Sequence, residues 1–148
     1  MNVWGIDLGG TKIECVVLND QNLEIIERQR IPTEADKGYD HILSQIKKLI
    51  DKVSDQLGEK PDRIGFATPG VLEPATQTMK NCNTTCMNGR AMQQDLEALL
   101  AIPVRIANDA NCFALAEARM GAGKKYPDAE VVFGVIMGTG VGGGLIVH

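Results

Sequence analysis

The sequence predicts an α/β fold in which helices flank a mixed β-sheet. Short apolar, β-branched runs that end at glycine or proline alternate with longer segments whose apolar residues recur at helical spacing. A strand–glycine–strand unit at residues 3–18 also recurs near residue 132, which indicates a duplicated architecture. The predicted order is a run of strands, a helix, a strand, a long loop, a helix, a strand and a helix, followed by a last pair of strands.

The first two strands flank the turn Gly9-Gly10-Thr11-Lys12 and form a β-hairpin. Glycines without Cβ atoms let backbone N–H groups approach an anion, while Thr11 adds a hydroxyl donor and Lys12 adds positive charge. Asp7 lies among the last residues of the first strand, beside this turn. The combination suits a phosphate group, with Mg²⁺ held through water and phosphate oxygens. The alternative is an ordinary tight turn next to an aspartate.

Local signals give bounds for each element. Strands are predicted at residues 3–8, 13–18, 24–30, 63–68, 104–107, 132–138 and 144–147, and helices at residues 37–57, 91–100 and 110–120. Asp36 is the expected N-cap of the first helix, and Gly58 is its expected stop. The stretch 73–89 shows no periodicity. So long a loop inside a compact domain is uncommon unless it binds something.

Asp109 is the candidate for proton chemistry. It lies where a predicted strand ends and a helix begins, which is where α/β folds usually bind ligands. The helix N-terminus favours its ionised form, and a carboxylate there can accept a hydroxyl proton as the oxygen attacks phosphorus. Asn108 and Asn111 can hydrogen-bond neighbouring hydroxyls. The alternative is that Asp109 only caps the helix.

The glycine-rich stretch at residues 138–144 formally contains the G-x-G-x-x-G pattern. That dinucleotide fingerprint requires a helix next, whereas the following segment is strand-like, so this interpretation fails and an anion-binding turn remains. Two hairpins that hold a phosphate chain from either side would form a nucleotide clamp. Chance similarity of two buried hairpins is the alternative.

Composition narrows the class of protein. With 148 residues, 44% hydrophobic and 23% charged, the chain corresponds to about one globular domain. The net charge of −4 argues against nucleic-acid or membrane-surface partners, and no apolar run approaches the roughly 20 residues that span a bilayer. Asp7 and Lys12 interrupt any signal-peptide core, so we expect a cytoplasmic protein. Cys82 and Cys86 lack the paired spacing of a zinc site.

Together these segments resemble the ROK family of sugar kinases and repressors, which belongs to the actin-like (ribonuclease H-like) and hexokinase superfamily. The matching motifs run through the whole sequence in the family's order: DLGGTK at 7–12, TPG at 68–70, Asn83, NDANC at 108–112, ALAE at 114–117 and GTGVGGG at 138–144. The stretch from Asn108 is closest to members that phosphorylate N-acetylhexosamines and glucose.

The resemblance implies transfer of the γ-phosphoryl group of ATP to a sugar hydroxyl. It assigns the catalytic base to Asp109, and the sugar pocket to Gly70, Asn83, Asn108 and Asp109. It assigns the first phosphate loop to Gly9, Gly10, Thr11 and Lys12, with Asp7 near Mg²⁺, and the second to Gly138, Thr139 and Gly140.

Family members extend well beyond this length, and their later half carries the adenine pocket, a structural zinc site and further sugar ligands. The resemblance therefore implies that residues 1–122 form an N-terminal actin-like lobe and that residues 123–148 begin a second, truncated lobe. It also implies a homodimer of the longer parent protein, and little activity for this chain alone.

Other functions stay open. A sugar-sensing repressor of the same family carries an N-terminal helix-turn-helix, whereas here the first hairpin starts at Val3 and the overall charge is acidic. A non-catalytic sugar-binding module would bind sugar without turnover.

Overall fold

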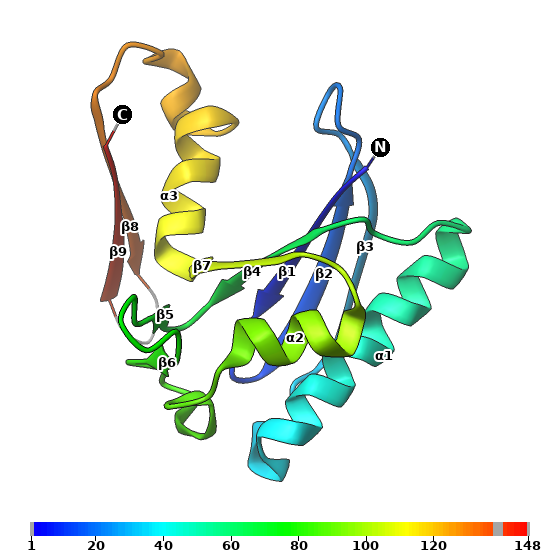
Figure 1. Cartoon of the computed structure of the whole chain (residues 1–148). Helices are drawn as coiled ribbons and strands as arrows, with labels where there is room; N and C mark the ends of the chain where they lie inside the picture. The colour runs from blue at the N-terminus through cyan, green and yellow to red at the C-terminus, as the bar shows by residue number, and fades with distance from the viewer. Residues whose placement is uncertain (1, 138–140, 148) are drawn as a thin grey trace.

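The computed structural model describes residues 2–137 and 141–147, and its main layer is a five-stranded sheet in the order β3-β2-β1-β4-β7 (Figure 1). These strands are β1 (Val3–Leu8), β2 (Lys12–Leu18), β3 (Ile25–Pro32), β4 (Ile64–Thr68) and β7 (Val104–Asn108). The β1–β2 and β2–β3 pairs are antiparallel, and the β1–β4 and β4–β7 pairs are parallel. The predicted α/β class with a mixed sheet is confirmed.

The first two helices of the chain pack on one face of this sheet, whereas the third packs mainly on the last two strands (Figure 1). The helices are α1 (Tyr39–Leu57), α2 (Met92–Leu100) and α3 (Asp109–Arg119), and the 3₁₀ turns are η1 (Ala35–Lys37), η2 (Thr85–Met87) and η3 (Ala122–Lys125). Trp4, Ile6 and Leu8 of β1 are at most 3% exposed, and they share one hydrophobic core with the apolar side of α1. Because side chains alternate along a strand, the opposite face of β1 presents Gly5 and Asp7.

The start of α1 differs from the prediction. Asp36 lies in η1, and Gly38, with a φ of 93°, precedes the first helical residue. A φ in this region suits glycine, so the chain turns there and not at Asp36. Tyr39 is buried, and its hydroxyl donates to Asp95 of α2 over 2.7 Å. The helix therefore begins where its first side chain anchors to α2.

The stretch 73–89 is more ordered than the sequence predicts. It includes β6 (Met79–Lys80), which pairs antiparallel with β5 (Val71–Leu72), and the turn η2. The side chain of Asn88 accepts the Cys82 N–H over 2.9 Å and donates to the Cys82 carbonyl over 3.1 Å. These elements are too short to give a period in the sequence, and buried Met79 and Met87 hold them in the core.

A second layer stands beside the sheet, formed by α3 and the antiparallel hairpin β8 (Val131–Met137)–β9 (Val141–Val147) (Figure 1). β9 begins at Val141, so residues 141–143 belong to a strand and not to the predicted break before residue 144. A Cβ atom added to Gly144 would lie 2.1 Å from the Ala110 carbonyl oxygen, and one added to Gly134 would lie 2.9 Å from Ala114 Cβ. Glycine at these positions lets the hairpin lie directly on α3.

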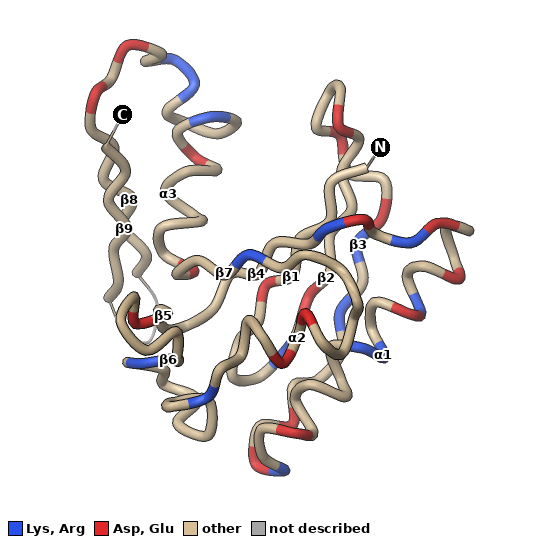
Figure 2. Tube along the Cα trace, in the orientation of Figure 1, with Lys and Arg blue, Asp and Glu red and all other residues tan. Residues whose placement is uncertain are grey.

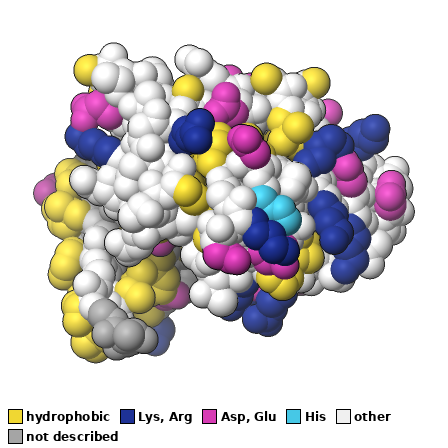
Figure 3. All heavy atoms as spheres, turned by 90° about the horizontal axis from the view of Figure 1, so that it is seen from below, with side chains coloured by type: hydrophobic (Ala, Val, Ile, Leu, Met, Phe, Trp, Pro, Cys, Tyr) yellow, Lys and Arg dark blue, Asp and Glu magenta, His cyan; other side chains and the backbone are white. Residues whose placement is uncertain are grey.

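The outward face of the hairpin is apolar and exposed. The exposed side chains on it are Val131, Phe133, Val135, Met137, Val141, Leu145 and Val147. Hydrophobic side chains accordingly line the edge of the molecule at the left of Figure 3. A continuous exposed apolar face of this kind is typical of a surface that another part of a protein covers. Among the described helices, none is long and apolar enough to cross a membrane.

We expect Gly144→Ala to lower the free energy of unfolding by about 2 kcal/mol, because the new methyl group overlaps the first turn of α3. Urea denaturation of the chain measures this. Gly5→Ala is the matched control, since a Cβ atom there meets nothing within 4 Å. Equal stability of the two variants would show that the hairpin does not rest on α3 through Gly144.

Candidate functional site

The carboxyl ends of β1, β4 and β7 meet at one edge of the sheet. Asp7 pairs with Ala67, Ala67 pairs with Ala107, and Thr68 pairs with Asn108. This edge is where parallel strands of α/β folds bind ligands. The register therefore brings the end of the first strand next to the start of α3, although the two are far apart in sequence.

The first turn of α3 is capped by Asn108. Its Oδ1 accepts the N–H groups of Ala110 and Asn111 over 3.1 and 3.3 Å. Asp109 is the first helical residue, and its Oδ1 accepts the Ala110 N–H over 2.7 Å. Within the described residues, Asp109 Oδ2 has no hydrogen-bond partner. Capping therefore falls mainly to Asn108, and one carboxylate oxygen of Asp109 remains available.

Acidic groups gather where the sheet meets α3. Burial raises the pKa of the Asp7 carboxyl, the negative charges of Asp109 and Glu14 raise it further, and Lys12 opposes them. Figure 2 shows acidic positions on β1, on β2 and at the start of α3. The charges of Asp7 and Asp109, which the sequence singled out separately, are thus close enough for one to raise the pKa of the other.

Cys112 belongs to the same cluster. Burial raises the pKa of its thiol, and Asp109 and Asp7 raise it further. The position of Cys112 three residues after Asp109 was the signal for a shared helix face.

The turn at residues 9–12 presents hydrogen-bond donors. The Gly9 N–H donates to the Lys12 carbonyl over 3.0 Å, which closes the turn. The N–H groups of Gly10 and Thr11 have no protein partner in the part of the chain that the structure describes. Gly10, Thr11 and Lys12 are exposed. Free backbone donors beside a hydroxyl and an ammonium group are what an anion site requires.

Glu14, close to this turn, is already paired. Its carboxylate accepts from Arg28 over 2.6 Å and lies 3.7 Å from Arg30. The hydrogen bond from Arg28 lowers the pKa of Glu14. Asp7 is therefore the carboxylate near the turn that keeps its capacity for a cation.

The residues assigned to the sugar pocket lie in different surroundings. Gly70 is buried, and a Cβ atom there would lie 2.4 Å from Cys82 Sγ, so it allows the loop after β6 to pack closely. Asn83 is exposed on that loop. The neighbouring Thr84 Oγ1 would lie 3.2 Å from a Cβ atom on Gly10. The loop that carries Asn83 therefore packs beside the turn at 9–12.

The structure describes only part of the glycine-rich stretch at residues 138–144. Gly138, Thr139 and Gly140 lie outside the described residues. In the hairpin β8–β9, Gly134 pairs with Gly144 where the hairpin contacts α3, and the pairing continues up to Met137 with Val141. Asn111 Oδ1 accepts the Leu145 N–H over 3.3 Å, so this side chain ties β9 to the α3 N-terminus. Within residues 2–137 and 141–147, no cluster of His, Cys, Asp or Glu suits a metal ion by itself.

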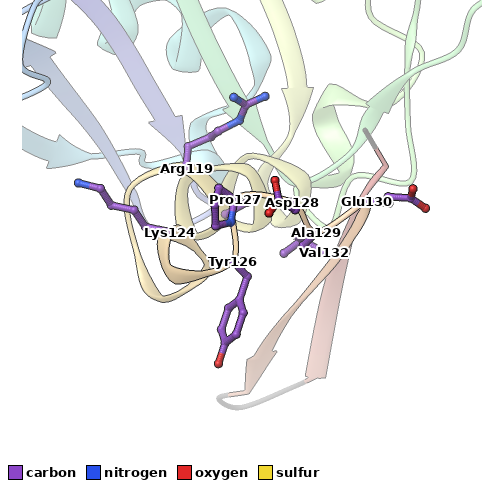
Figure 4. A pocket seen from close by; sticks show the side chains of 9 residues that line it. Arg119, Lys124, Tyr126, Pro127, Asp128, Ala129, Glu130 and Val132 are labelled. Carbon is purple, nitrogen blue, oxygen red and sulfur yellow. The ribbon is translucent and has the colours of Figure 1, made fainter.

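A separate cavity of about 400 Å³ lies at the opposite end of α3, bounded by η3 and β8. The labelled side chains Arg119, Lys124, Tyr126 and Glu130 point in different directions (Figure 4). Charged side chains that point away from one another cannot bind the same small ligand. The edge formed by Asp7, Asp109 and the turn at 9–12 is the better candidate site.

Known proteins are similar to this chain in sequence and in fold. The model of the ROK family matches residues 3–148. An N-acetyl-D-glucosamine kinase from Pasteurella multocida (strain Pm70) is 41% identical over 144 residues, which are 97% of this chain and 45% of that protein. An N-acetylgalactosamine kinase from Shewanella sp. (strain ANA-3) is 39% identical over 144 residues, which are 97% of this chain and 44% of that protein.

A ROK family glucokinase from Streptomyces griseus, solved in complex with glucose and AMPPNP, superposes with a TM-score of 0.83 at 26% identity, over 99% of this chain and 45% of that one. The chain spans about half the length of the curated relatives it matches. The actin-like fold implied by the resemblance is confirmed. Since the family match leaves out only Met1 and Asn2, this chain belongs to the ROK family.

Proposed function

We propose that this chain is the N-terminal portion of an ATP-dependent kinase that phosphorylates a hydroxyl of a hexose or an N-acetylhexosamine. The observation that carries the proposal is the strand register that brings Asp7 and the Asn108–Asp109 junction to one edge of the sheet, next to a turn with free N–H groups. Family membership and the names of relatives about 40% identical support the same reaction. Because those relatives are longer, the activity is proposed for the parent protein.

Asp109 is the proposed general base. The Ala110 N–H donates to one carboxylate oxygen of Asp109. The other carboxylate oxygen is left to accept the proton of the sugar hydroxyl while the hydroxyl oxygen attacks the γ-phosphorus. Phosphoryl transfer depends mainly on positioning and charge, so a carboxylate fixed on a helix start suits the role. Asn108 and Asn83, with Gly70 supporting the loop, form the sugar side of the proposed site.

The turn at 9–12 is the proposed first phosphate loop. Its free N–H groups, the Thr11 hydroxyl and the Lys12 ammonium suit the phosphates of ATP, and Asp7 suits the water shell of Mg²⁺, which takes few protein carboxylates. When bound, Mg²⁺ supplies positive charge that offsets the charge developing on the phosphates. Gly138, Thr139 and Gly140 remain the proposed second phosphate loop.

We also propose that residues 1–122 form one lobe and that residues 123–148 begin a second. The hairpin β8–β9 packs on α3, and its outward apolar face suits coverage by further chain of the second lobe. A chain that holds only one wall of the cleft is expected to turn over poorly. The homodimer, and the zinc site and adenine pocket of the later half, stay predictions from the resemblance.

The alternatives have less support. A repressor would bind DNA, which the net charge of −4 opposes, and the relatives compared above are named as kinases. A sugar-binding module without turnover is separated from a kinase by the assay below. A cytoplasmic location is supported by the need for ATP and by four free cysteines.

We expect Asp109→Asn in the parent protein to lower kcat for sugar phosphorylation about a thousandfold, because the amide cannot take the hydroxyl proton. Sugar affinity, measured by calorimetry, is expected to stay within a few fold. Asp51→Asn, on the exposed side of α1, is the matched control and keeps full activity. If Asp109→Asn keeps more than a tenth of the wild-type turnover, Asp109 is not the base. If the wild-type protein binds sugar but does not phosphorylate it, the sugar-binding module is favoured over the kinase.

Replacing Asp7 is expected to stabilise the chain although it lowers ATP use. Its pKa is raised above the ordinary 3.8, mainly by burial, so the ionised carboxylate costs stability at neutral pH. The cost vanishes below that ordinary value, where folded and unfolded chains are both protonated. We therefore expect Asp7→Asn to stabilise this chain against urea at pH 7, with a smaller gain at pH 4, while ATP use by the parent falls.

The matched control is Asp55→Asn, an exposed position on α1, for which urea midpoints are expected to follow wild type at both values of pH. An Asp7→Asn chain that is less stable than wild type at pH 7 would contradict the conclusion that the ionised Asp7 carboxylate costs stability.

A further inference from the structure

Thr33 is hydrogen-bonded to the turn at residues 9–12. It follows β3 in the chain and is fully buried, with 0% of its surface exposed. Its Oγ1 donates to the Gly9 carbonyl over 2.7 Å, and its N–H donates to the Thr11 carbonyl over 2.9 Å. A single residue from outside the hairpin β1–β2 therefore holds two carbonyls of its turn.

These bonds decide where the turn's donors point. In a trans peptide, the C=O and N–H of one plane point in opposite directions. The Gly9 carbonyl shares its plane with the Gly10 N–H. When the Thr33 hydroxyl holds that carbonyl, the Gly10 N–H is directed away from β3. This is the same N–H that has no partner among the described residues and belongs to an exposed glycine.

Thr33 is itself firmly held. The preceding Pro32 pairs with Lys12 across β2 and β3, and its carbonyl accepts Gln45 Nε2 of α1 over 2.8 Å. Gln45 is only 8% exposed. Pro32 also restricts the backbone at the strand end. The turn, by contrast, contains two adjacent glycines that on their own allow many backbone conformations. The support is therefore stiffer than the turn that it supports.

We propose that Thr33 is a positioning residue for phosphate binding: it selects the conformation of residues 9–12 in which the Gly10 N–H faces the polyphosphate chain of the nucleotide. This inference rests on the proposed function, since it takes that ligand to be the phosphates of ATP. Thr33 acts through Gly9 and Thr11 and touches no reacting atom.

The test uses the ¹⁵N-labelled chain titrated with magnesium tripolyphosphate, a probe that needs no adenine pocket. Thr33→Val keeps the shape and removes the hydroxyl, whereas Thr33→Ser keeps the hydroxyl. We expect wild type and Thr33→Ser to bind alike through the Gly10 and Thr11 amides, and Thr33→Val to bind about tenfold more weakly. The Gly10 amide resonance of Thr33→Val is also expected to shift before any ligand is added.

Val53→Ala is the control for general destabilisation, because Val53 is a fully buried residue of α1. It is expected to lower stability and to keep wild-type binding. Thr33→Val that binds like wild type, or Thr33→Ser that binds as weakly as Thr33→Val, would overturn the role of Thr33 and leave the kinase proposal intact. Absence of any Gly10 or Thr11 shift in wild type would overturn the role of Thr33 together with the first phosphate loop.

A parent protein that lacks sugar kinase activity, while wild type still binds the probe through Gly10 and Thr33→Val binds it weakly, would overturn the kinase proposal alone. The two inferences are therefore separable.

Discussion

The parallel pairing of β1 with β4, and of β4 with β7, is the constraint on which the rest of the structure depends. It aligns the carboxyl ends of the strands, so that Asp7 and the Asn108–Asp109 junction reach the same edge. Burial of Trp4, Ile6 and Leu8 fixes this register. A slip of one residue would turn the apolar residues of β1 to the other face and move Asp7 into the core.

The helix α3 joins this edge to the second layer. Its first turn carries Asp109, and the same turn receives the hairpin through Gly144 and through the bond from Leu145 N–H to Asn111. The carboxylate and the hairpin are thus placed by one rigid element.

The two loops of the proposed site are held by side-chain hydrogen bonds from residues that are not assigned to ligand binding. Thr33 holds the turn at 9–12, and Asn88 holds the loop that carries Asn83. Ordering a flexible loop costs conformational entropy, and ligand binding is weaker when the ligand must supply that ordering. Hydrogen bonds that order these loops beforehand leave the exposed donors of the turn at 9–12 available, which accounts for the polar side chain of Thr33 at a buried position.

The sequence by itself determined the α/β class, the first hairpin, the extent of α1 to Gly58 and the strand-to-helix junction at Asp109, because periodicity and turn chemistry are local properties. The tertiary structure alone decided that Asp7, Asp109 and Cys112 interact, that β9 includes its glycines, that Gly38 and not Asp36 precedes α1, and that Thr33 supports the turn. These features depend on strand order, register and close packing between segments distant in the chain, which local patterns do not specify.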